Sequence, residues 1–101
     1  MYRITLHLGV IVSLRHKGLK RLFERDDEGR LPPDLLVRIR IILAHLDEAR
    51  SIDDMRLPGL RLHALKGGLK GYWSVAVSAN WRIIFRFAGE DARDVDLIDY
   101  H

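Results

Sequence analysis

The sequence predicts an α+β domain in which two N-terminal helices pack on one face of a mainly antiparallel sheet of three to five strands. The first half of the chain spaces its apolar residues as a helix does, and the second half changes to the alternation of strands. Consecutive strands after the helices favour an antiparallel meander. The 101 residues are enough for one core, and they contain no cysteine that could form a disulfide or act as a thiolate.

Two helices are predicted in the first half. The first spans residues 17–25, and its apolar positions are Leu19, Leu22 and Phe23. Pro32 and Pro33 open the second, because the fixed φ of proline suits a first helical turn. Its apolar stripe consists of Leu35, Leu36, Ile39, Ile42, Leu43 and Leu46. Ser51, followed by two aspartates, indicates a short third helical turn.

Three strands are predicted in the second half. Residues 72–77 and 81–87 are rich in β-forming side chains and are joined by a short hairpin loop, and residues 94–99 follow after a further turn. One face of the middle strand carries Trp81, Ile83, Phe85 and Phe87, and the other carries Arg82, Ile84 and Arg86. Alternation in residues 1–10 also predicts an N-terminal strand that runs into Ile11.

Charge is distributed unevenly, although the net value is only +3. Residues 55–89, the basic block, hold six Lys and Arg and no Asp or Glu, whereas residues 90–101 hold five acids and one Arg. A basic block with Tyr72, Trp73 and Trp81 suits a phosphate-backbone partner, although a solvated basic face is the alternative. If the helices cover one face of the sheet, the other face displays Arg82 and Arg86.

Several classes of function are disfavoured. No apolar stretch approaches the roughly 20 residues of a membrane span, and Arg3 and His7 make the first ten residues a poor secretory signal. Without cysteine, a cytoplasmic location is expected. The sequence also lacks histidine or cysteine clusters at metal-binding spacing, and residues 66–68 lack the context of a phosphate loop. We therefore expect neither a metal nor a cofactor.

His63 and His101 lie close in sequence to the basic, aromatic half of the domain. Two proton-transfer groups beside cationic side chains are the minimum for metal-free RNA cleavage. One group removes the proton of the ribose 2′-hydroxyl, the second protonates the departing 5′-oxygen, and Lys or Arg stabilises the charge on the phosphate. Only RNA carries this internal nucleophile.

Five ordered blocks of the sequence closely resemble the HigB toxins of the RelE/ParE superfamily. They are HKGLK at 16–20, RLHALKG at 61–67, GYWSV at 71–75, NWRI at 80–83 and DYH at 99–101. The resemblance covers residues 11–101 as a RelE-like toxin domain. It leaves residues 1–10 as an extension that reflects either an upstream start codon or an additional edge strand.

The resemblance implies the toxin of a type II toxin–antitoxin module that cleaves the mRNA codon in the ribosomal A site. It implies a HigA-like helix-turn-helix antitoxin, through which alone the toxin would contact operator DNA. By matching position, the catalytic group would be His63, Asp99, Tyr100 and His101. Tyr100 would orient the scissile nucleotide, and Asp99 would set imidazole orientation or charge. The expected RNA-binding residues are Lys66, Lys70, Asn80, Arg82 and Arg86.

Some features leave alternatives open. Trp73 and Trp81 are expected in the core rather than as stacking platforms, whereas Tyr72 lies on the opposite pleat. Ala64 replaces the proline that the family commonly has after the histidine. A toxin that acts on DNA gyrase, or an attenuated module that only binds antitoxin and regulates an operator, remain the alternatives to a nuclease.

Overall fold

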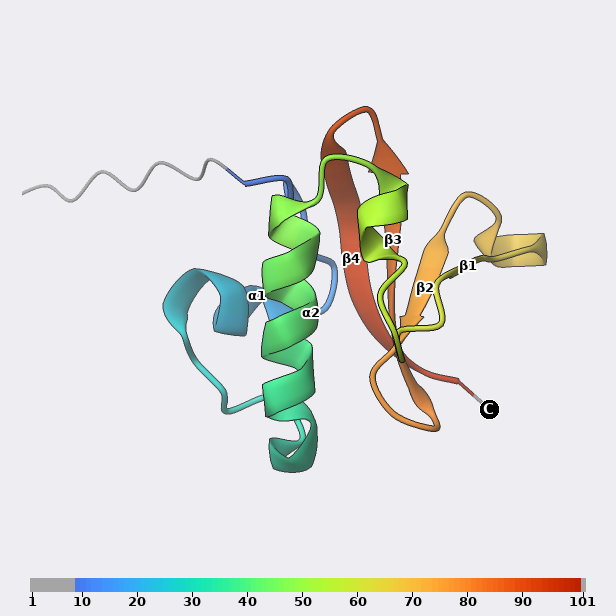
Figure 1. Cartoon of the computed structure of the whole chain (residues 1–101). Coiled ribbons are helices and arrows are strands. Elements are labelled where there is room, and N and C mark those ends of the chain that lie inside the picture. The colour runs from blue at the N-terminus through green and yellow to red at the C-terminus, as the bar shows by residue number, and fades with distance from the viewer. Residues whose placement is uncertain (1–8, 101) are drawn as a thin grey trace, which may run out of the picture.

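The computed structural model describes residues 9–100, and it confirms the predicted α+β architecture with both helices on one face of an antiparallel sheet (Figure 1). The helices are α1, Lys17–Arg25, and α2, Leu36–Glu48. The strands are β1 (His63–Ala64), β2 (Trp73–Ala76), β3 (Trp81–Ala88) and β4 (Asp91–Asp99). Short 3-10 turns occupy Pro33–Leu35, Ile52–Met55 and Gly67–Leu69.

The four strands lie in the order β1-β2-β3-β4, and every neighbouring pair is antiparallel. Residues 11–14 run parallel to β4 through bridges from Ile11 to Ala92 and from Leu14 to Val95. Most of the predicted N-terminal strand, residues 1–8, lies outside the described residues. Ile11, into which that strand was expected to run, does join the sheet edge.

The structure at the start of α1 explains why histidine and glycine stand at positions 16 and 18. The ring Nδ1 of His16 accepts the backbone N–H of Gly18 at 3.0 Å and of Leu19 at 3.2 Å, so it caps two of the free donors of the helix. A Cβ at Gly18 would lie 2.9 Å from Leu31 Cδ2, so this position excludes larger side chains. The predicted third helical turn is also confirmed, with a capping box at its N-cap residue, Ser51.

The core lies between the helices and the sheet. Its fully buried members include Leu19, Ile39, Ile42, Leu46, Val75, Ile83, Phe85 and Val95. Burying a side chain of this size contributes about 1.5–3 kcal/mol. Trp73 and Trp81 pack against this cluster, which confirms that they belong to the core side of the sheet.

Strand β4 begins at Asp91, three residues earlier than the alternation of apolar residues predicts. The first residues of β4 are held in the sheet by main-chain hydrogen bonds, and their side chains do not follow the apolar alternation of a strand. Ala92 pairs with Phe87 of β3 and exchanges hydrogen bonds with the main chain of Val10 and Val12. A register shift follows, and Asp94 adopts a left-handed φ of 53°. The irregularity interrupts the alternation that sequence analysis relies on.

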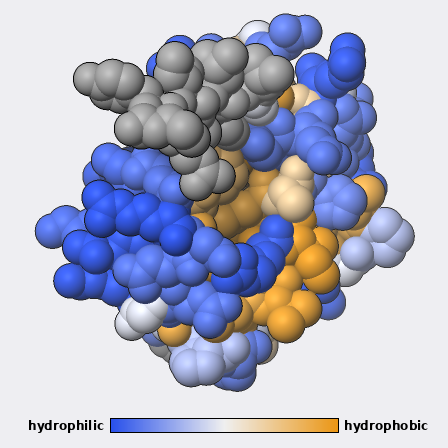
Figure 2. Space-filling model, turned by 90° about the vertical axis from the view of Figure 1, so that its left-hand side faces the viewer, coloured by the Kyte–Doolittle hydropathy of each residue, from blue (hydrophilic) through white to orange (hydrophobic). Residues whose placement is uncertain are grey.

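The helical side of the molecule is polar around a hollow with apolar walls (Figure 2). On this side a pocket between residues 11–14 and α1 includes Ile11, Val12, Leu14 and Phe23 in its lining. None of the helices in the part of the chain that the structure describes is long and apolar enough to cross a membrane.

Candidate nucleic-acid interface

The sheet face away from α1 and α2, here called the open face, carries His63 in a row of four side chains. Residues directly opposite each other in antiparallel strands point to the same face. His63 is opposite Ser74, Ser74 is opposite Ile84, and Ile84 is opposite Asp96. The neighbouring row contains Ala76, Arg82 and Ile98. The register therefore brings His63 and Arg82 to one face, although they are distant in sequence.

Arg82 lies beneath Tyr100, with its guanidinium carbon 5.2 Å from the centre of the phenol ring. This is within the range of a cation–π contact. Tyr100 is held at the edge by a hydrogen bond from its N–H to the carbonyl of Asn80, and its side chain is 43% exposed. The Nε and Nη1 atoms of Arg82 are buried, and no acceptor within residues 9–100 bonds to them. Buried charged donors without an acceptor suit an anionic ligand.

The imidazole of His63 is exposed, and its Nδ1 lies 3.2 Å from the carbonyl oxygen of Arg61. A carbonyl can only accept, so this contact requires the proton on Nδ1. In the neutral ring the lone pair is then on Nε2. The backbone of Arg61 thus orients the ring and fixes the tautomer that can accept a proton.

Asp99 and Tyr100, two neighbouring members of the predicted catalytic group, lie on opposite faces of the sheet. Asp99 is opposite Trp81, which packs against the core, so the register directs Asp99 to the helical side of the sheet. The contact with Arg82 places the ring of Tyr100 on the open face instead. His101 lies outside the described residues. Of the described members of the predicted catalytic group, His63 and Tyr100 therefore lie on the open face, which also carries Arg82, and Asp99 does not.

The predicted RNA-binding residues flank this face. Lys66 and Lys70 are exposed at either end of the 3-10 turn that connects β1 to β2, and Asn80 is exposed in the β2–β3 loop. Gly67 in that turn has a φ of 65°, a conformation that favours glycine. Lys66 and Lys70 thus lie at the start of β2 and Asn80 beyond its end, and their contacts with RNA stay predictions.

Arg86 belongs to a different row, on the other side of His63 from Arg82. Its guanidinium carbon is 4.4 Å from the ring centre of Tyr72, and its Nε is 3.6 Å from a carboxylate oxygen of Asp94. The Tyr72 hydroxyl in turn accepts a hydrogen bond from Arg15 at 3.1 Å, which raises the pKa of Arg15. The structure thus holds Arg86 in an intramolecular network. Tyr72 is buried in it rather than exposed for stacking.

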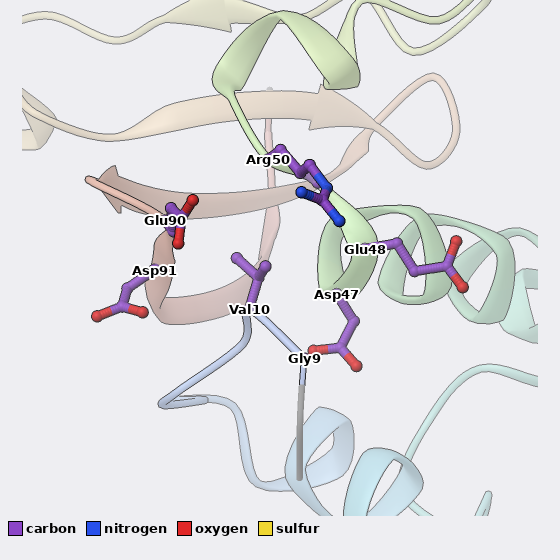
Figure 3. A pocket seen from close by; sticks show the side chains of 8 residues that line it. Gly9, Val10, Asp47, Glu48, Arg50, Glu90 and Asp91 are labelled. Atoms are coloured by element: carbon purple, nitrogen blue, oxygen red, sulfur yellow. The ribbon is translucent and has the colours of Figure 1, made fainter.

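A pocket at the opposite end of β3 has the reverse charge (Figure 3). Its charged lining consists of Asp47, Glu48, Glu90, Asp91 and Arg50. Asp47 joins the end of α2 to residues 10–11, because its carboxylate accepts the N–H of Ile11 and its carbonyl accepts the N–H of Val10. Four carboxylates against one guanidinium repel a phosphate backbone. Within residues 9–100 no three His, Asp or Glu side chains are grouped so that they could hold a metal ion.

Sequence analysis missed a second pocket beside Arg82, lined by side chains of Arg38 and Arg61 as well. Arg38 comes from α2, where it lies off the apolar stripe, and Arg61 comes from the segment before β1. Only the fold brings these residues together with the β2–β3 hairpin. The basic count of residues 55–89 included Arg61, but no signal in the sequence connects it with Arg38.

Comparisons with known proteins identify the family of the chain. The sequence profile of the family described as RelE-like toxin of type II toxin-antitoxin system HigB matches residues 12–101. The chain is 42% identical over 92 residues to Endoribonuclease HigB of Proteus vulgaris, covering 91% of this chain and 100% of that protein. It is 33% identical over 78 residues to Toxin HigB-1 of Vibrio cholerae serotype O1, covering 75% and 82%.

Solved structures share the fold at low identity. YafQ from E. coli superposes with a TM-score of 0.59 and 18% identity, covering 90% of this chain and 92% of YafQ. The YoeB dimer from Staphylococcus aureus gives a TM-score of 0.57 and 16% identity, covering 92% and 97%. These likenesses support the fold alone. The family profile and the two HigB relatives show that the chain belongs to the HigB family of RelE-like toxins, whose type II systems pair a toxin with an antitoxin.

Proposed function

We propose that this toxin is a ribosome-dependent endoribonuclease that cuts mRNA in the A-site codon without a metal ion. The observation that carries the proposal is the placement of His63, Arg82 and Tyr100 on one open face, with buried donors of Arg82 lacking an acceptor within residues 9–100. The name of the Proteus vulgaris relative, Endoribonuclease HigB, supports the same activity.

The proposed reaction is an internal transfer. The ribose 2′-oxygen bonds to the adjacent phosphorus, the bond from phosphorus to the 5′-oxygen breaks, and the products are a 2′,3′-cyclic phosphate and a free 5′-hydroxyl. His63 accepts the 2′-hydroxyl proton at Nε2, because its Nδ1 is committed to the Arg61 carbonyl. His101 donates a proton to the 5′-oxygen. Arg82 stabilises the charge that develops on the phosphate.

Tyr100 and Asp99 have supporting roles in this proposal. The exposed Tyr100 ring offers a stacking surface for a base beside the scissile phosphate, and Arg82 supports it from below. Asp99 is a positioning residue, since its side chain is directed to the other face of the sheet. It pairs with Trp81 and so keeps the main chain that leads into Tyr100 in register.

Partners follow from the same family. We propose a HigA-like helix-turn-helix antitoxin as the partner that restrains the toxin in the cytoplasm and contacts operator DNA for the pair. Lys66, Lys70 and Arg86 provide phosphate contacts to mRNA or to the ribosome, and Asn80 contacts a base edge. Phosphate contacts position RNA, whereas base contacts specify it.

The test is cleavage of a defined mRNA by the purified chain on ribosomes with an occupied P site. We expect cuts within the A-site codon, 5′-hydroxyl and cyclic-phosphate ends, and no cleavage of the same mRNA without ribosomes. His63→Ala and His101→Ala should each abolish cutting while the thermal unfolding curve stays native. Uncut mRNA with the folded native chain would refute the proposal, and DNA damage with intact transcripts in induced cells would identify a gyrase-directed toxin instead.

A further inference from the structure

We infer that the pocket between α2, residues 57–62 and the β2–β3 hairpin, here called the arginine pocket, binds a second phosphate group of an RNA backbone. This inference deepens the proposed function and rests on it. The pocket has a volume of about 400 Å³ and opens next to Arg82. Its lining includes Arg38, Gly59, Arg61, Ala76 and Arg82.

The charge of the lining favours an anion. Three of its side chains are guanidinium groups and none is a carboxylate, in contrast to the four carboxylates of the pocket at the far end of β3. Arg and Lys side chains that converge without acids repel one another unless an anion lies between them. Guanidinium groups also match the geometry of phosphate oxygens.

The pocket is built from three distant segments. One guanidinium nitrogen of Arg38 donates to the Gly59 carbonyl at 2.8 Å and to the Ala76 carbonyl at 3.4 Å. The N–H of Ala76 donates to the carbonyl of Leu60 at 2.7 Å. These bonds fix α2, residues 59–60 and β2 around the cavity. Because they use only the Nη2 atom of Arg38, its other donors remain for a ligand.

Arg61 connects the pocket with His63. Its φ of 52° lies in the left-handed region, which is strained for a residue with a Cβ. In this conformation its carbonyl reaches the Nδ1 of His63 and its side chain lines the pocket. One residue thus orients the proposed base and carries a cation toward a neighbouring phosphate.

Arg82 lines the pocket from the other side while it supports Tyr100 on the open face. Its Nε and Nη1 are the buried donors for which residues 9–100 provide no acceptor. A phosphate bound between Arg82 and Arg61 would satisfy one of these donors and leave the other for the scissile phosphate. This phosphate would lie next to the scissile phosphate in the RNA. It would therefore determine which phosphate of the RNA reaches the proposed catalytic residues.

The phosphate could belong to mRNA or to ribosomal RNA, and binding assays separate the two sources. One arm measures the affinity of the full chain for a short single-stranded RNA with 2′-O-methyl riboses, which keeps every phosphate but cannot be cut. The second arm uses 30S subunits that carry no mRNA. Each affinity is measured across salt concentrations, because every phosphate contact contributes about 0.7 to the slope of log K against log salt for single strands.

The informative variant is Arg61→Asn, since asparagine tolerates a left-handed φ and the exposed position should leave the fold intact. Its control is Arg30→Asn, which removes one exposed positive charge outside the pocket. We expect Arg61→Asn to weaken binding several-fold and reduce the slope by about 0.7 in one arm, Arg61→Lys to retain the slope, and Arg30→Asn to match the native chain.

The arm that responds identifies the source of the phosphate. Native slopes for Arg61→Asn in both arms would overturn the inference, even if the chain cleaves mRNA on ribosomes. Conversely, a chain that fails to cleave but shows the slope change would refute the proposed function and leave the pocket established. Equal losses for Arg61→Asn and Arg30→Asn would also overturn the inference, because they would reflect overall charge.

Discussion

Ser74→Ala is expected to stabilise the protein, although it removes a polar group from the row of His63. The Ser74 side chain is 1% exposed, and its Oγ has no hydrogen-bond partner in the part of the chain that the structure describes. A buried hydroxyl without a partner costs about 1–3 kcal/mol. Replacing the hydroxyl with a hydrogen atom should recover about 1 kcal/mol after the small loss of packing. For a domain of this size, the melting temperature should rise by about 4–8 °C.

Ser13→Ala is the matched control, and its effect should have the opposite sign. The Ser13 Oγ accepts the N–H of Asp94 at 2.8 Å, at the irregular position of β4. Removing it leaves a partly buried N–H unpaired and should cost about 1 kcal/mol. Thermal and urea unfolding of both variants measures the two shifts. A loss of stability in Ser74→Ala comparable to that of Ser13→Ala would refute the reasoning, because it would show that the Ser74 hydroxyl has a partner.

Three further substitutions test other parts of the structure. His16→Ala should lower the free energy of unfolding by about 1 kcal/mol through loss of the α1 cap, and His16→Asn should lose less, as measured by urea unfolding. Gly71→Ala should destabilise by about 1–3 kcal/mol, because its φ is 98° and a Cβ would lie 2.7 Å from Arg86 Nη1. Part of this loss should disappear in an Arg86→Ala background, and purely additive losses would contradict the contact. Arg82→Gln should reduce ribosome-dependent cleavage by about 10²–10³-fold at an unchanged melting temperature. Native cleavage rates in that variant would remove Arg82 from the site.

The helices and the longer strands could be predicted because each buries an apolar stripe with its own period. The sequence predicts α1 over the residues that form it, and it assigns Trp73 and Trp81 to the core side. Strand β1 has no such signal, because His63 and Ala64 are both exposed and are extended only through pairing with β2. Local pattern therefore identifies elements that bury their own side chains, but it does not identify elements that are held only by hydrogen bonds.

The site was partly predictable for a similar reason. Motif resemblance assigns His63 and Tyr100 to one catalytic group; the register places His63 on the open face, and the contact with Arg82 places the ring of Tyr100 there. Alternation alone could have separated Asp99 from Tyr100, since successive strand residues point to opposite faces. Arg38 could not be connected to the site, because a helix residue and a hairpin meet only after the core has packed. The spacing of residues along the chain does not predict tertiary contacts of this kind.

The distribution of charge along β3 explains why the net charge says little about RNA binding. At about 3.3 Å per residue, the eight residues of this strand span roughly 26 Å. The Debye length at physiological ionic strength is about 8 Å, so the two ends of the strand act independently on a phosphate backbone. The arginine pocket would attract RNA at the Trp81 end, while the carboxylates around Asp91 would repel it at the Ala88 end. A polyanion on the open face is therefore drawn toward His63 and Arg82, and the acidic residues near the β3–β4 turn contribute to its orientation rather than oppose its binding.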